Sequence, residues 1–434
     1  MNIVIERKEL KISVRDLEIG MNVVKLDRPW IETNFLLQGF VIQDQQEIDA
    51  FMEQCEFVYI ELLVSEEADY TLDRRNIKMG LATRGQRIRP TIEHSIENTN
   101  ASSYKNNKKV SYINKIPVQK EMAVAKTSYE FARTTVKGIM DGIRIGRLIE
   151  IKEAKEVVNS IVDSILRNND ALMWLTRLKE KDEYTAEHSI NVCILSVTFA
   201  RHLGLEEDEI RRIGLSGFLH DVGKAKIPIE VLAKPGRFTD EEYNIMKDHP
   251  LFGRDLLMGL QETEQFTIDV AYSHHERIDG SGYPRGLHSY QISYYSLIVS
   301  IVDTYDAITS QRCYDMGRSS MDALDIIYKC RGTQFDENLA IEFIKCIGIY
   351  PPGAIVEMTN GEVGLILANN DGNKLKPKVI LVLDADKKNT KERVVDLKNS
   401  VCDEQGKVYK ISKELPNGKY GVDIKDYIKK GLII

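Results

Sequence analysis

The pattern of apolar and polar positions divides the chain into three parts. In the first 66 residues, short β-prone runs such as 22–26 (NVVKL) and 57–60 (FVYI) surround one amphipathic helical stretch near 46–54. From Ile151 onward, apolar residues recur at steps of three and four, the stripe of a buried helix face, and helical patterning continues to about Ile347. The chain therefore predicts a mainly helical domain after a small α+β region.

Strand patterning returns after Gly353. Residues 354–367 read AIVEMTNGEVGLIL, in which residues alternate around Asn360-Gly361, a dipeptide typical of two-residue hairpin turns. The apolar run 379–383 follows a few residues later. These features predict a small β-rich C-terminal extension.

A polar segment separates the α+β region from the helical region. Residues 98–120 read NTNASSYKNNKKVSYINKIPVQK, with five lysines and no acid. We interpret this segment as an exposed linker, with a basic contact surface as the alternative. The predicted organisation is an α+β domain at 1–70, a linker at 71–123, a helical domain at 124–349 and a β-rich extension at 350–434.

Composition narrows the class of protein. The formal net charge of -7 and the pI near 5.8 give no general attraction to polymeric nucleic acid or to an anionic membrane. The six cysteines are scattered without a CxxC pair, which is typical of reduced thiols. Charged residues occupy the start of the chain, and no run of 18 apolar residues occurs. We expect a cytoplasmic protein that neither crosses a membrane nor acts on DNA or RNA polymers.

Histidine is scarce, with eight residues, yet five of them stand in chemically suggestive surroundings. Composition alone gives about one His-acid dipeptide, so the His-Asp pair within LHDVGK is weak evidence by itself. A His-His pair followed seven residues later by a Gly-Tyr-Pro triplet is much harder to obtain by chance. The five are His188, His220, His249, His274 and His275, whereas His94, His202 and His288 lack such a context.

Imidazole and carboxylate groups are ligands for first-row divalent metals, and an aspartate can bridge two ions through its two oxygens. Asp221, directly after His220, suits such a bridge. His188 is predicted on a helix with a buried apolar face, and Asp303 follows the apolar run 297–302. Both side chains would then project from core helices, as in a metal site inside a helical bundle.

Several ordered motifs in residues 124–349 resemble those of the HD-GYP family. They are HSINV, FLHDVGKAKIP, KPGRFTDEEYNIMKDHPLFG, SHHERIDGSGYPRGL and SIVDTYDAITSQRCY. The resemblance implies a mainly α fold, with a helical HD-type metal-dependent phosphohydrolase domain between the two smaller regions. It also implies hydrolysis of cyclic di-GMP to linear pGpG, and often on to GMP, in a site that commonly holds iron or manganese.

The resemblance carries over residue by residue. It implies that Asp221 and Lys224 are catalytic, that Lys224 contacts the phosphate, and that Arg312 grips it. Asp306, one helical turn after the expected ligand Asp303, would support the ligands, with a helix cap or surface acid as the alternative. The implied substrate loop is Gly282, Tyr283 and Pro284, and the implied metal ligands are His188, His220, Asp221, His249, His274, His275 and Asp303.

One departure from the family pattern affects the expected chemistry. Members proposed to bind three metals have a glutamate four residues before the first ligand histidine, where this chain has Tyr184. Neighbouring Glu183 and Glu187 would point elsewhere on a helix. We therefore expect two divalent ions, with iron favoured and manganese the alternative, and Tyr184 as packing or substrate wall. Hydrolysis that stops at the linear dinucleotide is plausible.

The N-terminal segment resembles a domain of unknown function that is often fused to HD-GYP domains. Trp30 and Phe35 could line a sensory pocket there, although apolar core is the better interpretation. The sequence leaves open the sensed signal and whether the chain forms a homodimer or binds a regulatory protein.

The predicted function is therefore a metal-dependent cyclic di-GMP phosphodiesterase. With two divalent ions, five neutral histidines and two aspartates, the site would carry a formal charge of about +2 and attract a phosphodiester despite the acidic chain. One alternative keeps the chemistry and prefers 3'3'-cyclic GMP-AMP. Another is a non-catalytic cyclic dinucleotide receptor or interaction module. A third, a generic HD-type nucleotidase, would not explain the Gly-Tyr-Pro loop.

Overall fold

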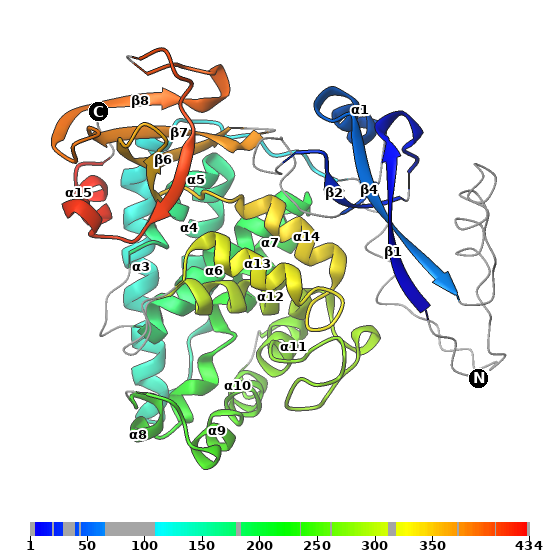
Figure 1. The fold of residues 1–434 in the computed structure, drawn as a ribbon. Helices are drawn as coiled ribbons and strands as arrows, with labels where there is room; N and C mark the ends of the chain where they lie inside the picture. The colour runs from blue at the N-terminus through cyan, green and yellow to red at the C-terminus, as the bar shows by residue number, and fades with distance from the viewer. Residues whose placement is uncertain are drawn as a thin grey trace. The chain divides into compact units, whose positions relative to one another are not determined.

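The fold was analysed in a computed structural model of the chain. It describes residues 5–19, 21–28, 40–42, 45–65, 109–178, 184–234, 236–260, 263–310, 318–370, 373–403 and 405–431. The chain forms two compact units, residues 1–98 and 99–434 (Figure 1). Each unit is described by itself.

The first unit is a small α+β structure. Its antiparallel sheet has the order β1-β4-β2-β3. Val23 and Val58 on its strands are fully buried, as is Phe51 on the helix α1, so the alternating and helical apolar patterns share one core. The elements are β1 (Ile5–Ser13), η1 (Val14–Asp16), β2 (Asn22–Leu26), β3 (Phe40–Val41), α1 (Gln45–Gln54) and β4 (Phe57–Ser65). The predicted α+β fold is confirmed.

The first half of the helical domain is organised around α6, which is buried along most of its length. Residues 187–200 of this helix are all buried, because α3, α4, α7, α12 and α14 surround it. The predicted apolar stripe after Ile151 faces this core from α4. The elements are α3 (Val118–Arg144), α4 (Ile151–Arg167), α5 (Asn169–Leu175), α6 (Tyr184–Leu203), α7 (Glu207–Leu219), η4 (Val222–Lys226), α8 (Ile229–Leu232) and α9 (Asp240–Met246).

The second half of the domain adds the helices that complete the site. Helix α10 packs against η4 and α11, while α12 lies against α6 and α11. The α12 core includes fully buried Ile298, Val299 and Ile301, which confirms the helix predicted before Asp303. The elements are α10 (His249–Met258), α11 (Gln265–Ser273), η5 (Ser289–Gln291), α12 (Tyr294–Thr309), α13 (Ser320–Lys329) and α14 (Glu337–Ile347).

The C-terminal extension is a five-stranded antiparallel sheet with the order β8-β7-β6-β5-β9. The predicted hairpin joins β5 and β6. Its loop is longer than two residues, because the hydrogen bond that closes it runs from Met358 N to Glu362 O. Gly361 within this loop has φ 89°. The elements are β5 (Ile355–Met358), β6 (Val363–Asn370), β7 (Asn373–Leu383), β8 (Asn389–Asp396), η6 (Leu397–Asn399), β9 (Ile411–Leu415), η7 (Lys419–Gly421) and α15 (Ile424–Lys429).

Side chains near the end of α5 attach this sheet to the helical domain. Buried Trp174 donates from Nε1 to the carbonyl oxygen of Leu367 on β6 at 2.9 Å. Arg177 bridges to Glu414 on β9 at 3.2 Å and to Ser320 Oγ at 2.6 Å. The extension is thus joined to the helices by buried apolar and charged contacts.

The described end of the predicted linker is attached to the helical domain. Tyr112 Oη donates to Leu205 O at 2.9 Å, and Asn168 Nδ2 donates to Ile116 O at 2.8 Å. Residues 71–108 of this segment, together with Trp30 and Phe35, lie outside the described residues. The proposed domain boundaries stay predictions.

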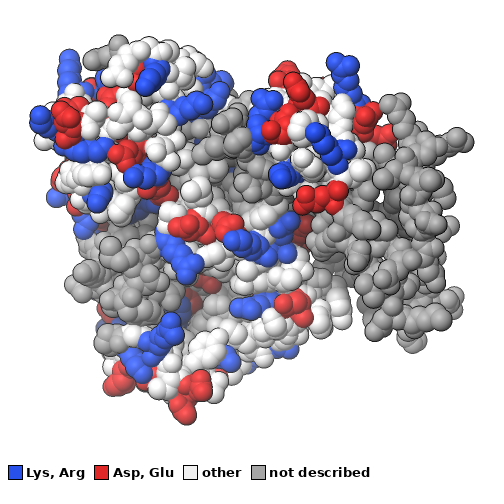
Figure 2. Space-filling model, viewed as in Figure 1, with Lys and Arg blue, Asp and Glu red and all other residues white. Residues whose placement is uncertain are grey.

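Basic and acidic side chains alternate over the face seen in Figure 2, in line with the modest net charge. The five cysteines in the described ranges are free thiols. Across those same ranges, we find no helix with the length and apolar character of a membrane span.

Candidate metal centre

Five helical segments bring seven predicted ligands to one place. His188 extends from α6 and Asp303 from α12, while His220 and Asp221 follow the end of α7. His249 begins α10, and the adjacent pair His274-His275 follows α11. All seven are buried except His275, whose side chain is 25% exposed.

The ligating atoms form two neighbouring groups. The first triad consists of His188, His220 and Asp303, and the second of His249, His274 and His275. Within each triad, the candidate donor atoms lie within 4.8 Å of one another. Two sets of three donors are therefore available side by side.

Asp221 lies between the two triads and turns one oxygen toward each. Its Oδ2 is 3.5 Å from His188 Nε2 and 3.3 Å from His220 Nε2. Its Oδ1 is 3.2 Å from His249 Nε2 and 3.7 Å from His274 Nε2. This is the arrangement expected of a bridging carboxylate.

Backbone carbonyls orient three of the histidines. The Nδ1 atoms of His220, His249 and His274 lie 2.8 Å from Gly217 O, 2.7 Å from Met246 O and 3.1 Å from both Val270 O and Ala271 O. A carbonyl oxygen can only accept, so each Nδ1 carries the proton and each Nε2 keeps a lone pair facing the centre.

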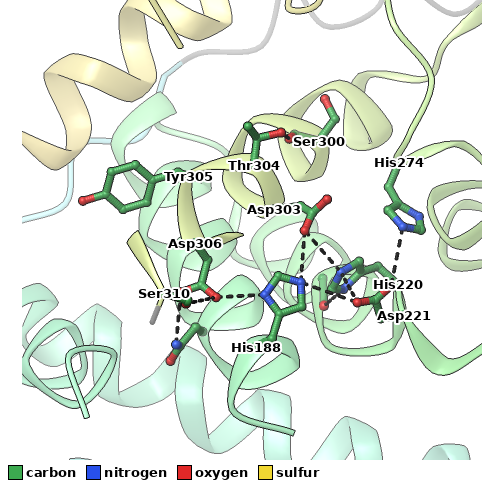
Figure 3. A network of polar contacts seen from close by, with 12 residues as sticks. His188, His220, Asp221, His274, Ser300, Asp303, Thr304, Tyr305, Asp306 and Ser310 are labelled. Atoms are coloured by element: carbon green, nitrogen blue, oxygen red, sulfur yellow. Dashed lines mark hydrogen bonds and ion pairs between the residues drawn. The ribbon is translucent and has the colours of Figure 1, made fainter. Parts of the chain in front are cut away.

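A carboxylate orients the fourth histidine. Asp306 Oδ2 lies 2.8 Å from His188 Nδ1, and Asp306 itself accepts from Asn191 Nδ2 at 3.1 Å and Ser310 Oγ at 3.1 Å (Figure 3). The supporting position predicted for Asp306 is thus observed. Sequence reasoning missed Asn191, although it stands three residues after His188 and so shares its side of the helix.

Two buried atoms at the centre make no hydrogen bond with any part of the chain that the structure describes. They are His220 Nε2 in the first triad and Asp221 Oδ1, which faces the second triad. Leaving such atoms unsatisfied costs about 1–3 kcal/mol each. Nitrogen and oxygen donors of this kind suit first-row divalent metals, so the buried His and Asp clusters are consistent with a metal site.

Burial sets the protonation of most histidines here. It lowers the pKa of His220, lowers that of His249 to about 4 and lowers that of His275 well below its usual value. For His188, burial is outweighed by the hydrogen bonds of Asp303 and Asp306, which raise its pKa to about 9. Most of the centre therefore offers neutral imidazoles, the form that binds metals.

The carboxylates at the centre are ionised. Burial would raise the pKa of Asp221, but nearby Lys224 and His220 outweigh it and hold that pKa well below its usual value. Burial would also raise the pKa of Asp303, but its hydrogen bond with His188 outweighs burial and holds that pKa below its usual value. Both therefore present anionic oxygens.

Lys224 lies at the edge of this centre, with its ammonium 2.5 Å from Asp221 Oδ2 and its side chain 19% exposed. The spacing of four residues between His220 and Lys224 predicts that both lie on one side of the same helix, and this prediction is wrong. Helix α7 ends at Leu219 and Lys224 belongs to the 3-10 helix η4. The tighter turn brings η4 so close to α10 that a Cβ on Gly223 would overlap the backbone of His249.

The predicted substrate loop borders the second triad. The ring of Tyr283 stacks on His275, with centroids 4.7 Å apart and planes at 27°. Gly282 is required because a Cβ there would overlap the backbone of Glu276. Buried Glu276 accepts from the amides of Arg285 at 2.7 Å and Leu287 at 2.9 Å, a support that sequence reasoning missed. Pro284 is exposed on this loop.

Two sequence expectations cannot be placed in this geometry. Arg312 lies within 311–317, outside the described residues. Tyr184 begins α6, but its side chain also lies outside the description. The roles expected of both stay predictions.

Comparisons with known proteins agree with this architecture. A family model described as HD domain matches residues 169–339, and one described as a domain of unknown function, DUF3391, matches residues 9–154. The chain is 37% identical over 284 residues to the cyclic di-GMP phosphodiesterase PA4108 of Pseudomonas aeruginosa, covering 65% of this chain and 68% of that protein.

Two further relatives match shorter stretches of the chain. The cyclic di-GMP phosphodiesterase response regulator RpfG of Xanthomonas campestris is 40% identical over 172 residues, covering 39% of this chain and 46% of that protein. The 3'3'-cGAMP-specific phosphodiesterase 1 of Vibrio cholerae is 34% identical over 157 residues, covering 36% of each. The chain spans less than half of either protein.

A helical domain with a His-Asp pair at the centre of two ligand triads defines the HD class of metal-dependent phosphohydrolases. Within that class, the chain belongs to the HD-GYP family of HD-domain phosphodiesterases and carries a DUF3391 region at its N-terminus.

Proposed function

We propose that this protein is a metal-dependent phosphodiesterase that hydrolyses cyclic di-GMP to linear pGpG. The observation that carries the proposal is Asp221, which turns one oxygen toward each of two histidine-containing triads. The relatives from P. aeruginosa and X. campestris, which bear the name of this activity, support the choice of substrate.

The residues fit two divalent metal ions. His188, His220 and Asp303 would hold one ion and His249, His274 and His275 the other, with Asp221 shared between them. When bound, such ions supply Lewis-acid activation of water and neutralise charge on the phosphate. We favour iron, with manganese as the alternative.

The side chains around the centre would bind and orient the substrate. Lys224 pairs directly with Asp221, and its partly exposed ammonium can donate to a non-bridging phosphate oxygen while it remains beside that carboxylate. Tyr283 closes the side of the second triad and keeps His275 partly covered. Arg312 would add a second cation to the phosphate.

The product is expected to be mainly the linear dinucleotide. Position 184 is a tyrosine, so the chain lacks the glutamate that the family pattern associates with a third metal. Further hydrolysis to GMP is then slower than opening of the ring.

A second candidate substrate is 3'3'-cyclic GMP-AMP. The V. cholerae relative named for that substrate shares 34% identity over 157 residues of this chain. Both substrates present the same phosphodiester to the centre, so base contacts outside it would decide the preference. A non-catalytic receptor for cyclic dinucleotides is the remaining alternative.

The test is hydrolysis of cyclic di-GMP and cyclic GMP-AMP by protein reconstituted anaerobically with iron or manganese, with products followed over time. Asp221→Ala is expected to lower turnover by at least about a thousandfold, because it removes both carboxylate oxygens, one of which faces each triad. Asp325→Ala is the control, since Asp325 forms an exposed ion pair with Lys329. No turnover of either substrate by wild type, with binding retained, would favour the receptor.

A further inference from the structure

Helix α9 carries an exposed aromatic ring near the candidate centre. None of its residues is buried, and Tyr243 is 45% exposed. The helix leads through Lys247 and Asp248 directly to His249, the first residue of α10 and a member of the second triad. Figure 1 shows α9 beside α10 at one end of the helical domain.

Lys247 lies close to two tyrosine rings. Its Nζ is 4.5 Å from the ring centroid of Tyr243 and 5.9 Å from that of Tyr283. Among the described residues, no carboxylate forms an ion pair with Lys247. Its positive charge therefore faces aromatic surface and is available to an anion from outside the chain.

This surface is continuous with the centre. Tyr283 stacks on His275, and Tyr243 is close enough to Tyr283 to add to the effect of burial in raising the pKa of its phenol. We call Tyr243, Lys247 and Tyr283 the aromatic wall. It extends from the second triad outward to α9.

The contact between Tyr243 and Lys247 has a simpler explanation in part. The two residues are four apart, and pairs at this spacing stabilise a helix by a few tenths of a kcal/mol. That explanation does not account for Tyr283, which comes from a different segment and has its ring centroid 5.9 Å from the same ammonium.

We propose that the aromatic wall binds the half of the cyclic dinucleotide that is not being cleaved. A purine base would lie against the exposed ring of Tyr243, and the second phosphodiester would pair with Lys247. This inference rests on the proposed function. Its physical basis is that aromatic faces and lysines together form sequence-tolerant nucleotide sites, in which one stacked base changes affinity by roughly tenfold.

The test compares the kinetics of Tyr243→Ala and Lys247→Met with wild type on cyclic di-GMP. Each change is expected to raise KM about tenfold and to alter kcat by less than about twofold, because neither residue contacts the cleaved bond. Tyr243→Phe should restore KM by keeping the ring, and Lys247→Arg by keeping the charge. Both parent variants should fold normally, since α9 buries no residue.

The chain offers a matched control pair, Tyr427 on α15 and Lys430 directly after it, and Figure 1 shows α15 at the opposite end of this unit. Lys430 Nζ lies 5.3 Å from the ring centroid of Tyr427, but it also pairs with Glu392. Tyr427→Ala and Lys430→Met are expected to leave KM unchanged. Equal KM values for wild type, Tyr243→Ala and Lys247→Met would overturn the proposal.

Failure of this subsite can be distinguished from failure of the proposed function. If wild type does not hydrolyse the substrate, the function fails, and titration of cyclic di-GMP into metal-loaded protein then tests the wall. Weaker binding by Lys247→Met and Tyr243→Ala would support the subsite in a receptor. Binding equal to wild type, or no binding by wild type, would overturn it.

Discussion

The candidate centre and the aromatic wall differ in how firmly the fold holds them. At the centre, six of the seven predicted ligands are buried, and four histidines have an Nδ1 fixed by a carbonyl or carboxylate. On the wall, Tyr243 comes from α9, a helix without a buried residue, and Lys247 directly follows that helix. The ammonium of Lys247 lies 4.5 Å from the ring centroid of Tyr243 and 5.9 Å from that of Tyr283.

This difference separates two tasks of the site. Ligands must be held within a fraction of an ångström, so they need buried support from neighbouring elements. A surface that binds a base or a second phosphate tolerates more movement. Substitutions on the wall can therefore change substrate preference at little cost to folding, whereas substitutions around the centre affect folding and chemistry together.

The largest effect is expected where the centre depends on close backbone packing. Gly223→Ala should destabilise the helical domain by about 3 kcal/mol, because the added Cβ would overlap the backbone of His249 and Gly253. The measurement is urea denaturation followed by circular dichroism.

Gly138→Ala is the matched control for this substitution. Position 138 lies on the exposed face of α3 with no atom within 4 Å of an added Cβ, so alanine should stabilise by about 0.5 to 1 kcal/mol. If Gly223→Ala unfolds at the same urea concentration as wild type, the backbone around the centre can shift, and the centre is not held more firmly than the aromatic wall.

Sequence alone predicted the centre far better than the wall. The ligands stand in short motifs that resemble those of the HD-GYP family, and His188 and Asp303 lie within helices that the apolar periodicity also indicates, α6 and α12. The mainly helical fold and the hairpin near Asn360 followed from the same periodicities. Local patterns were sufficient because these features depend on neighbours in the sequence.

The missed features depend on contacts between distant segments. Glu276 holds the backbone of a loop that returns to it nine and eleven residues later, and Lys247 meets Tyr283 only after folding. The apolar periodicity also does not predict the 3-10 turn at Lys224, because this turn depends on the close packing of Gly223 against α10. Spacing in the sequence carries no information about such contacts.

An intermediate effect is expected from the support behind the first triad. Asp306→Ala should weaken metal binding by roughly 10- to 100-fold, because His188 loses the carboxylate that fixes its ring. Competition with a chromophoric chelator measures this affinity. Asn191→Ala should have a smaller effect, since Asn191 reaches His188 only through Asp306. Unchanged metal affinity in Asp306→Ala would contradict the role assigned to this carboxylate.

The smallest effect is expected at Glu276, which connects the two regions by holding the loop of Tyr283. In Glu276→Gln one carboxylate oxygen becomes an amide nitrogen, so the backbone amide of either Arg285 or Leu287 loses its acceptor. A looser loop should raise KM about fivefold, because Tyr283 is held less firmly, and should leave the metal content unchanged.

The control for this last prediction is Glu337→Gln, since Glu337 is 61% exposed and forms a surface ion pair with Arg331. Kinetics and metal analysis on the same samples distinguish two results. A raised KM with full metal content places Glu276 with the aromatic wall and keeps the two regions separate. Loss of metal in Glu276→Gln would mean that the loop and the second triad are coupled through the stacking of Tyr283 on His275. The distinction between a firm centre and an adaptable wall would then fail at this loop.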